Sequence, residues 1–276
     1  MNEWSRLVGA LPFDWAHYAF MQNALLAVML VSPLLALLGC LVVNNRMAFF
    51  SEALGHSALT GVALGALIGL RDPLPAMIGF AVLLALAMWA LRRHTAVPAD
   101  TAIALVMAFV VALGVVLLSR GGGFSKYSRY LIGDLLTIAP AEVGGLAGLT
   151  AVAGTLWMIF FNAFFFAGLN PSLAASRGLA VGRLEVLFSV VVAVVVAVCI
   201  PWIGLLVINS MLILPAAAAR NLADGTRSYV LGAAAVAVLS GVLGLISSYY
   251  WNTATGATIV LWAGLFFAAS LVLRRR

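Results

Sequence analysis

Nine long apolar stretches, separated by charged or turn-forming residues, dominate this sequence. They lie at about 18–43, 53–70, 74–91, 101–118, 143–167, 184–200, 202–219, 229–248 and 256–273. A helix of about 20 apolar residues crosses the hydrocarbon core of a bilayer. It also satisfies its own backbone hydrogen bonds, which lipid cannot do. We therefore predict an all-α fold, a polytopic transmembrane helical bundle with eight or nine spans.

The composition argues against a soluble protein. Hydrophobic residues make up 64% of the chain and charged residues only 9%, whereas an average soluble domain has about 45–50% and 25%. The formal net charge of +6 would suggest nucleic-acid binding in a soluble protein. Here the basic residues stand mostly between apolar stretches, as the positive-inside rule expects. We therefore expect lipid, and no nucleic acid, as the surrounding partner.

The arginines indicate an orientation but leave the number of spans open. Clusters that follow alternate stretches stand at 46, 92–93, 177 and 183, 220 and 227, and 274–276. Placing all of them in the cytoplasm gives nine crossings and puts the basic residues of loop 119–142 outside, against the same rule. In addition, Pro201 and Pro215 can divide residues 184–219 into one span and a half-helix, as in many transporters.

The first 17 residues differ from the rest of the chain. They mix charged residues with Trp4 and Trp15, and no basic segment precedes a short apolar core as in a signal peptide. We expect residues 1–17 to form an interfacial N-terminal segment anchored by tryptophan, and residues 18–276 to form a single transmembrane domain. Cys40 and Cys199 lie inside apolar stretches, so we interpret both as packed thiols and not as a disulfide or metal site.

One ionisable pair stands inside the apolar background. Glu52 and His56 are four residues apart, which places them one turn apart on the same helical face, and Thr60 continues that face. Ionisable residues within a membrane segment are costly and usually face a partner or a cavity. A carboxylate and an imidazole together suit zinc, manganese or ferrous iron. The alternative is that the two residues bond to each other or cap the helix.

Small residues repeat every four positions beside this pair, at Ala53, Ser57, Gly61, Gly65 and Gly69. Such a stripe lets helix backbones approach closely in lipid. One face of this helix is thus expected to pack tightly while the adjacent face lines a central path. A helix that only packs, with a polar end, is the alternative.

Two further segments carry polar signals. Asn209 and Ser210, within an apolar stretch, can line a path or bond locally to the backbone. Asn170-Pro171 is a helix start and Gly178 a helix stop, so a short helix is expected between them. Such a helix suits docking to another protein, and an ordinary interfacial turn is the alternative. Its candidate docking residues are Ser172, Leu173, Ala174, Ala175, Ser176, Arg177 and Gly178.

The chain offers no sign of an enzyme. Gly121-Gly122-Gly123 with Lys126 lacks the spacing of a phosphate-binding loop, and no strand precedes it. Neither the zinc-protease motif nor the hydrolase serine motif is present. We therefore expect no catalytic residues and no nucleotide-hydrolysing site.

Several segments together resemble the membrane permease subunits of zinc- and manganese-type ABC importers. The resemblance covers roughly residues 20–272 and is most specific between Asn45 and Gly65, which includes Glu52 and His56. Further similar segments are Asp100–Ile103, Tyr130–Leu136, Leu212–Arg220 and Thr255–Leu261.

This resemblance implies a multi-pass permease of the bacterial inner membrane that works as a homodimer. It implies a separate cytoplasmic ABC ATPase subunit as the partner that hydrolyses ATP, and an extracytoplasmic metal-binding protein that delivers the metal. Glu52 and His56 match positions that contact the metal in the family, and residues 172–178 match its coupling helix. The metal ion, zinc in the first place and manganese or iron otherwise, is cargo, and no resident cofactor is implied.

The chain departs from the family pattern at three places. The family usually has Asp at the position of Glu52 and Ser at that of Gly55, and its coupling loop usually begins with acidic residues where this chain has Asn170-Pro171-Ser172. Compared with the family's Asp, Glu52 keeps the negative charge, and its side chain is one methylene longer. The main competing hypothesis is an ion-coupled secondary metal transporter that works without an ATPase, with Glu52 as its proton carrier.

Overall fold

The computed structural model describes residues 2–94, 99–120 and 135–273, and these residues are almost entirely helical. The glycine run at 121–123 and the motif segment 130–134 lie outside this range. The helices are α1 (Asn2–Gly9), η1 (Asp14–His17), α2 (Ala19–Asn44), α3 (Ala48–Leu67), α4 (Leu74–His94), α5 (Ala99–Arg120), η2 (Leu135–Thr137), α8 (Pro140–Leu169), α9 (Pro171–Ser176), α10 (Val181–Ile203), α11 (Leu205–Leu222), α12 (Thr226–Trp251) and α13 (Thr255–Leu273).

Each of the nine predicted apolar stretches corresponds to one long helix, which confirms the all-α, multi-span fold. Eight of the described helices are long and apolar enough to cross a membrane. The ninth, α3, has 20 residues but is not among these eight. The α3 helix begins at Ala48, before the apolar stretch that starts at about residue 53. Ser51, Glu52 and His56 lower the hydropathy of this segment without breaking the helix.

Residues 184–219, for which one span and a half-helix was the alternative to two spans, belong to two helices that are each long enough to be a candidate span. Pro201 lies within the last turn of α10, and Pro215 lies inside a continuous α11. The break falls instead at Gly204, whose φ of 84° is in the left-handed region that glycine adopts without a steric cost. Both α10 and α11 therefore remain full-length helices.

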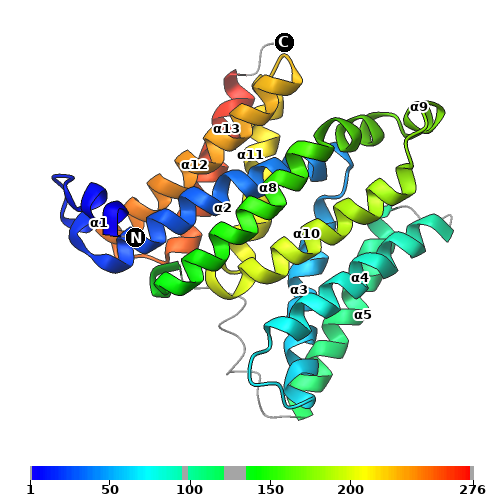
Figure 1. The fold of residues 1–276 in the computed structure, drawn as a ribbon, viewed down its shortest axis with the longest axis horizontal. Coiled ribbons are helices and arrows are strands. Elements are labelled where there is room, and N and C mark those ends of the chain that lie inside the picture. The colour runs from blue at the N-terminus through cyan, green and yellow to red at the C-terminus, as the bar shows by residue number, and fades with distance from the viewer. Residues whose placement is uncertain (1, 95–98, 121–134, 274–276) are drawn as a thin grey trace. The chain divides into compact units, whose positions relative to one another are not determined.

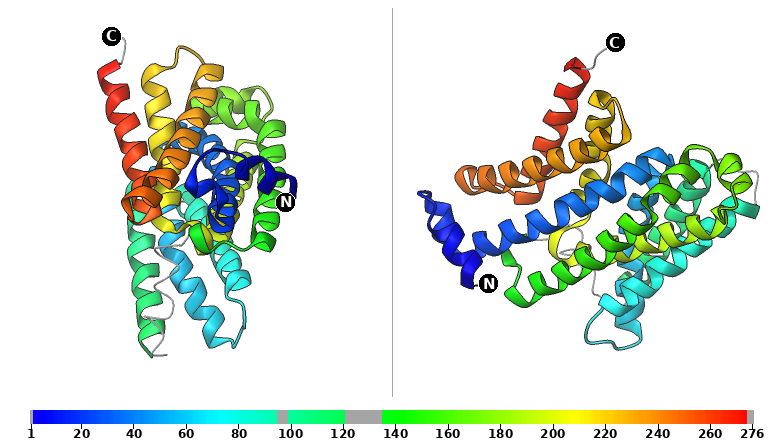
Figure 2. Two further views of the ribbon diagram at one scale, coloured as in Figure 1. Left: turned by 90° about the vertical axis from the view of Figure 1, so that its left-hand side faces the viewer. Right: turned by 45° about the horizontal axis from the view of Figure 1, so that its top comes forward.

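The chain forms two compact units, and α2, α8 and α10 each contribute residues to both. The first unit contains residues 1–40, 133–155 and 202–276. Within it, α11, α12 and α13 pack against one another (Figure 2). A Cβ atom at Gly244 would lie 2.5 Å from the Cα atom of Ile259, and the Thr258 hydroxyl donates to the Gly244 carbonyl at 2.9 Å. The Thr255–Leu261 motif is thus a helix-packing motif.

The second unit contains residues 41–132 and 156–201. In it, α3 packs against both α4 and α5, and the three helices lie side by side (Figure 1). A Cβ atom at Gly61 would lie 2.7 Å from the Cα atom of Met77 in α4, and one at Gly65 would lie 3.0 Å from the Ala76 side chain. The predicted packing stripe is confirmed at these two positions. Gly69 lies beyond the end of α3, in a turn with a φ of 79°.

The N-terminal residues form α1 and η1, and they bond to α2 within the first unit. The Trp4 indole N–H donates to the Gln22 carbonyl at 3.0 Å, and the Gln22 amide donates to the Ala16 carbonyl at 2.8 Å. Trp15 is buried in the protein. An interfacial position of this segment stays a prediction. The expectation of packed thiols is confirmed, because Cys40 and Cys199 are free and buried.

We predict that Gly61→Ala destabilises the protein although alanine favours helices. The added methyl group meets the α4 backbone, and overpacking of this kind costs about 1–3 kcal/mol. The apparent melting temperature of the detergent-purified protein, followed by tryptophan fluorescence, should fall by roughly 2–10 °C. Gly79→Ala in α4 is the matched control, because no atom lies within 4 Å of a Cβ atom there. Equal shifts for the two variants would contradict the close packing of α3 on α4.

Candidate functional site

Glu52 and His56 occupy a distinctive position on α3. Between Ser51 and Ala63 every residue is buried except these two, which are half-buried. Their spacing of four residues places them on one face of the helix, about one 5.4 Å turn apart. The apolar and small residues around them are used for packing. The ionisable pair is therefore the accessible part of an otherwise buried helix segment.

The two side chains do not satisfy each other. Within the described residues, neither Glu52 nor His56 forms a side-chain hydrogen bond or an ion pair. The helix begins after Met47, which has no side-chain cap, so Glu52 does not cap it. Two acceptor groups that are both half-buried and unbonded retain their capacity to bind a cation.

The pair supplies only part of a metal site. No group of three or more His, Cys, Asp or Glu residues that could hold a metal ion is found among residues 2–94, 99–120 and 135–273. A tetrahedral zinc ion takes four ligands. Water, another helix or a second subunit must therefore complete any coordination at Glu52 and His56.

Thr60 lies on the packed side of α3. Its side chain is fully buried, and its hydroxyl donates a 2.7 Å hydrogen bond to the carbonyl of Val110 in α5. A Cβ atom at Gly114 would lie 3.2 Å from the Thr60 Cα atom, so glycine at 114 lets the two helices meet. In this structure the hydroxyl connects α3 to α5, and a path-lining role for Thr60 stays a prediction.

Asn209 and Ser210 belong to α11 in the first unit and behave differently from each other. The Ser210 hydroxyl donates to the Leu206 carbonyl at 2.7 Å, one helical turn earlier, as in the local-bonding alternative. The Asn209 side-chain oxygen is buried and has no hydrogen-bond partner among the described residues. A buried acceptor without a partner is costly in an apolar setting. Asn209 is thus the stronger of the two candidates for a path-lining role.

The short helix predicted between Asn170 and Gly178 is present as α9. The Asn170 side-chain oxygen accepts a 3.0 Å hydrogen bond from the Leu173 amide, and Pro171 occupies the first helical turn. Gly178 follows with a φ of 81°. The Arg177 guanidinium lies over the Phe166 ring at 5.3 Å, which ties α9 to α8.

The exposed side of α9 is suited to contact another protein. Ala174 is fully buried, whereas Leu173 is 44% exposed. The remaining candidate residues Ser172, Ala175, Ser176, Arg177 and Gly178 are exposed as well. Local capping therefore holds a short helix whose small and apolar side chains are accessible.

Comparison with known proteins gives a consistent result. Residues 17–274 match the ABC 3 transport family. The high-affinity zinc uptake system membrane protein ZnuB of Haemophilus influenzae is 33% identical over 259 residues, which cover 92% of this chain and 97% of that protein. The manganese import system permease protein ScaB of Streptococcus gordonii is 27% identical over 253 residues, covering 92% of this chain and 91% of that protein.

A solved structure extends the similarity to the fold. PsaBC from Streptococcus pneumoniae in complex with Fab superposes with a TM-score of 0.80 at 28% sequence identity. The superposition covers 98% of this chain and 95% of that chain. The resemblance to ABC permeases of the zinc and manganese type is confirmed, and these comparisons give no support to the ion-coupled alternative.

We predict that Asn170→Ala loosens α9. Loss of an N-cap costs about 1 kcal/mol, so backbone amides of residues 171–176 should exchange with deuterated water roughly fivefold faster. The measurement is hydrogen–deuterium exchange of the purified protein by mass spectrometry. Asn170→Asp keeps an acceptor at the cap and should exchange like the wild type. Unchanged exchange in the alanine variant would show that the Asn170 cap does not stabilise α9.

Proposed function

We propose that this chain passes its metal ion along the face of α3 that carries Glu52 and His56. The chain belongs to the ABC 3 transport family and is the membrane permease subunit of an ABC metal importer. The observation that carries the proposal is the accessibility of this pair on a helix that is otherwise buried from Ser51 to Ala63. Ionisable residues in such a setting usually mark an ion pathway.

The chemistry of the pair supports a transition-metal cargo. Carboxylate is a hard ligand that many divalent cations accept, whereas imidazole is a borderline ligand that favours transition metals over calcium or magnesium, so the pair suits zinc, manganese and ferrous iron. We propose zinc as the first cargo, in keeping with the named role of the Haemophilus relative, and manganese or iron as further candidates.

Partners supply what the chain lacks. We propose that ATP is hydrolysed by a separate cytoplasmic ATPase subunit, that an extracytoplasmic protein delivers the metal, and that two copies of this chain form the path. A second copy would bring a second Glu52 and His56 pair, and two such pairs would complete a four-ligand site. No cofactor other than the transported ion is needed for this scheme.

The coupling contact is proposed at α9. Its six residues are held by the Asn170 cap, and Leu173 is exposed at the centre of the helix. A capped, short helix transmits force better than a loop because its residues move together. We propose that Ser172–Gly178 sit on the ATPase subunit and couple its nucleotide cycle to alternating access.

The central test is metal uptake by liposomes that contain the chain with its ATPase subunit, supplied with the binding protein and ATP. We expect Glu52→Gln and His56→Gln each to reduce zinc uptake more than about tenfold. Loss of a group that only orients a metal ligand already lowers metal affinity or activity, and loss of the ligand itself should lower it at least as much. Both variants should still assemble with the ATPase subunit.

Matched controls are Asp224→Asn and His17→Gln, which change an exposed carboxylate and an exposed imidazole elsewhere. Both should transport like the wild type. Normal uptake by the α3 variants would refute the proposed path while leaving the family assignment intact. Metal uptake by the chain alone, driven by a proton gradient without ATP, would instead favour a secondary transporter.

The coupling proposal predicts that Leu173→Asp weakens association with the ATPase subunit. A charge at the centre of an apolar contact should raise the dissociation constant at least tenfold, which corresponds to about 1.4 kcal/mol. Association is measured with the purified subunits by light scattering. Leu222→Asp, at an exposed leucine that ends α11, is the control. Equal loss in both variants would contradict a specific contact at α9.

A further inference from the structure

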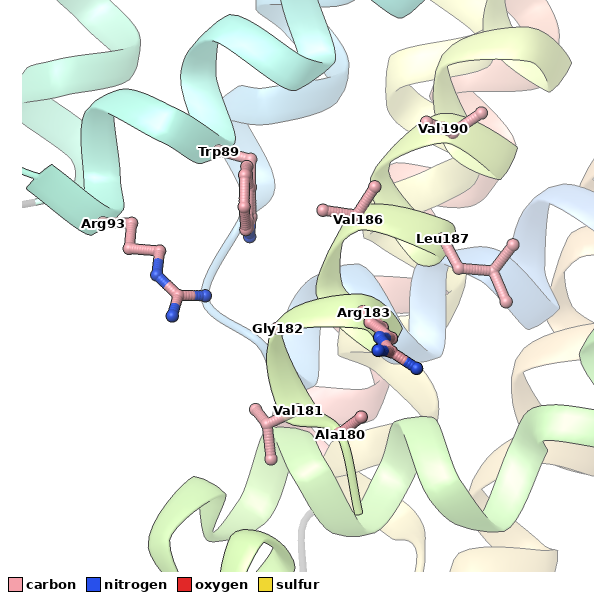
Figure 3. A pocket seen from close by; sticks show the side chains of 9 residues that line it. All are labelled: Trp89, Arg93, Ala180, Val181, Gly182, Arg183, Val186, Leu187 and Val190. Carbon is pink, nitrogen blue, oxygen red and sulfur yellow. The ribbon is translucent and has the colours of Figure 1, made fainter.

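A cavity of about 550 Å³ lies between the end of α4 and the beginning of α10, within the second unit. Trp89 and Arg93 line it from α4. From the other side it is lined by Ala180 and by six residues of α10, which are Val181, Gly182, Arg183, Val186, Leu187 and Val190. Figure 3 shows the Trp89 and Arg93 side chains projecting from α4 toward the first turn of α10. In the sequence, Arg93 and Arg183 are indicators of orientation only, and no local pattern predicts this cavity.

The polar side chains that line the cavity are all hydrogen-bond donors. Arg93 and Arg183 carry guanidinium groups, and Trp89 offers only its indole N–H. That indole nitrogen is buried and has no partner among the described residues. Neither guanidinium forms an ion pair in the part of the chain that the structure describes. Donors cannot satisfy one another, so the cavity is complementary to an acceptor that carries negative charge.

Local packing keeps the Arg93 group at the cavity. Its guanidinium carbon lies 5.6 Å from the centre of the Trp89 ring, in cation–π range. On the other side, a Cβ atom at Gly182 would lie only 2.6 Å from an Arg93 guanidinium nitrogen. Glycine at 182 therefore gives Arg93 room beside the start of α10.

The rest of the lining is aliphatic. Val186, Leu187 and Val190 continue the wall along α10, and both α4 and α10 are candidate membrane spans. The cavity combines basic groups at the ends of two spans with an aliphatic wall that continues along the spans. These two features match the charged headgroup and the acyl chains of a phospholipid. Basic pockets between transmembrane helices on the cytoplasmic side recognise anionic lipid headgroups.

We propose that this cavity binds an anionic phospholipid of the cytoplasmic leaflet, with Arg93 and the Trp89 indole N–H on the headgroup phosphate, Arg183 as a further cation of the wall that attracts the anionic headgroup, and an acyl chain along Val186 and Val190. An acidic loop of a partner protein would satisfy the donors but would have no use for the aliphatic wall. The proposal does not depend on which metal the protein carries or on the role of Glu52 and His56.

The test uses the chain purified in complex with its ATPase subunit and then stripped of lipid by detergent. The complex is titrated with phosphatidylglycerol, and native mass spectrometry measures the bound fraction. The double variant R93Q/R183Q should raise the dissociation constant at least about tenfold, because each charge-assisted hydrogen bond contributes more than a neutral one. Trp89→Phe removes only the indole donor and should have a smaller effect in the same direction.

The control variant R220Q/R227Q removes two exposed arginines elsewhere, so it reports general attraction to anionic lipid. Phosphatidylcholine and glycerol 3-phosphate are the comparison ligands, and both should bind more weakly than phosphatidylglycerol. Equal affinity of R93Q/R183Q and R220Q/R227Q for phosphatidylglycerol would overturn the proposal. Equal binding of glycerol 3-phosphate would show a phosphate site that does not recognise lipid chains. Loss of the ATPase subunit from R93Q/R183Q with lipid binding unchanged would assign the cavity to a protein contact.

Discussion

The close approach of α3 to α4 and α5 determines what the rest of α3 can do. Gly61 leaves room for the α4 backbone, and Gly114 leaves room for Thr60, whose hydroxyl reaches the Val110 carbonyl. In lipid there is no hydrophobic force that drives helices together, so small residues and interhelical hydrogen bonds carry the association. With these contacts made, Glu52 and His56 are the residues of the buried segment that stay accessible.

Most polar side chains inside the spans are used for the fold. Ser248 and Thr255 bond to each other at 3.0 Å, and the Tyr229 hydroxyl donates to the Cys40 carbonyl at 3.3 Å. Such bonds remove polar groups from lipid at little cost. Against that background, the groups left without protein partners are the informative ones. In the described part of the chain they include Glu52, His56, the Asn209 oxygen and the Trp89 indole nitrogen, besides the Asn44 amide nitrogen and the Thr150 hydroxyl. A passing ion or a bound ligand could satisfy the first four.

The proposed coupling helix and the proposed lipid cavity are neighbours along the chain. α9 ends at Ser176, and the wall of the cavity begins at Ala180. Arg177 is held over Phe166 of α8, and Gly178 provides the turn between the two segments. A lipid bound at Arg93 and Arg183 would therefore restrain the segment that leads from α9 into α10. Such a lipid would thus contact the residues that directly follow α9, the element that we propose to meet the ATPase.

The sequence alone determined the helices, because about 20 apolar residues in succession have no other stable arrangement in lipid. It also indicated the ionisable pair on α3 and the short helix after Asn170, since helical periodicity and capping are local properties. Tertiary structure decided the rest. The break between α10 and α11 depends on the backbone at Gly204, and the engagement of Thr60 depends on where Val110 lies. Trp89, Arg93 and Arg183 line one cavity only because α4, which ends at His94, and α10, which begins at Val181, lie on either side of it within one unit. Such contacts join distant parts of the chain, and no local pattern encodes them.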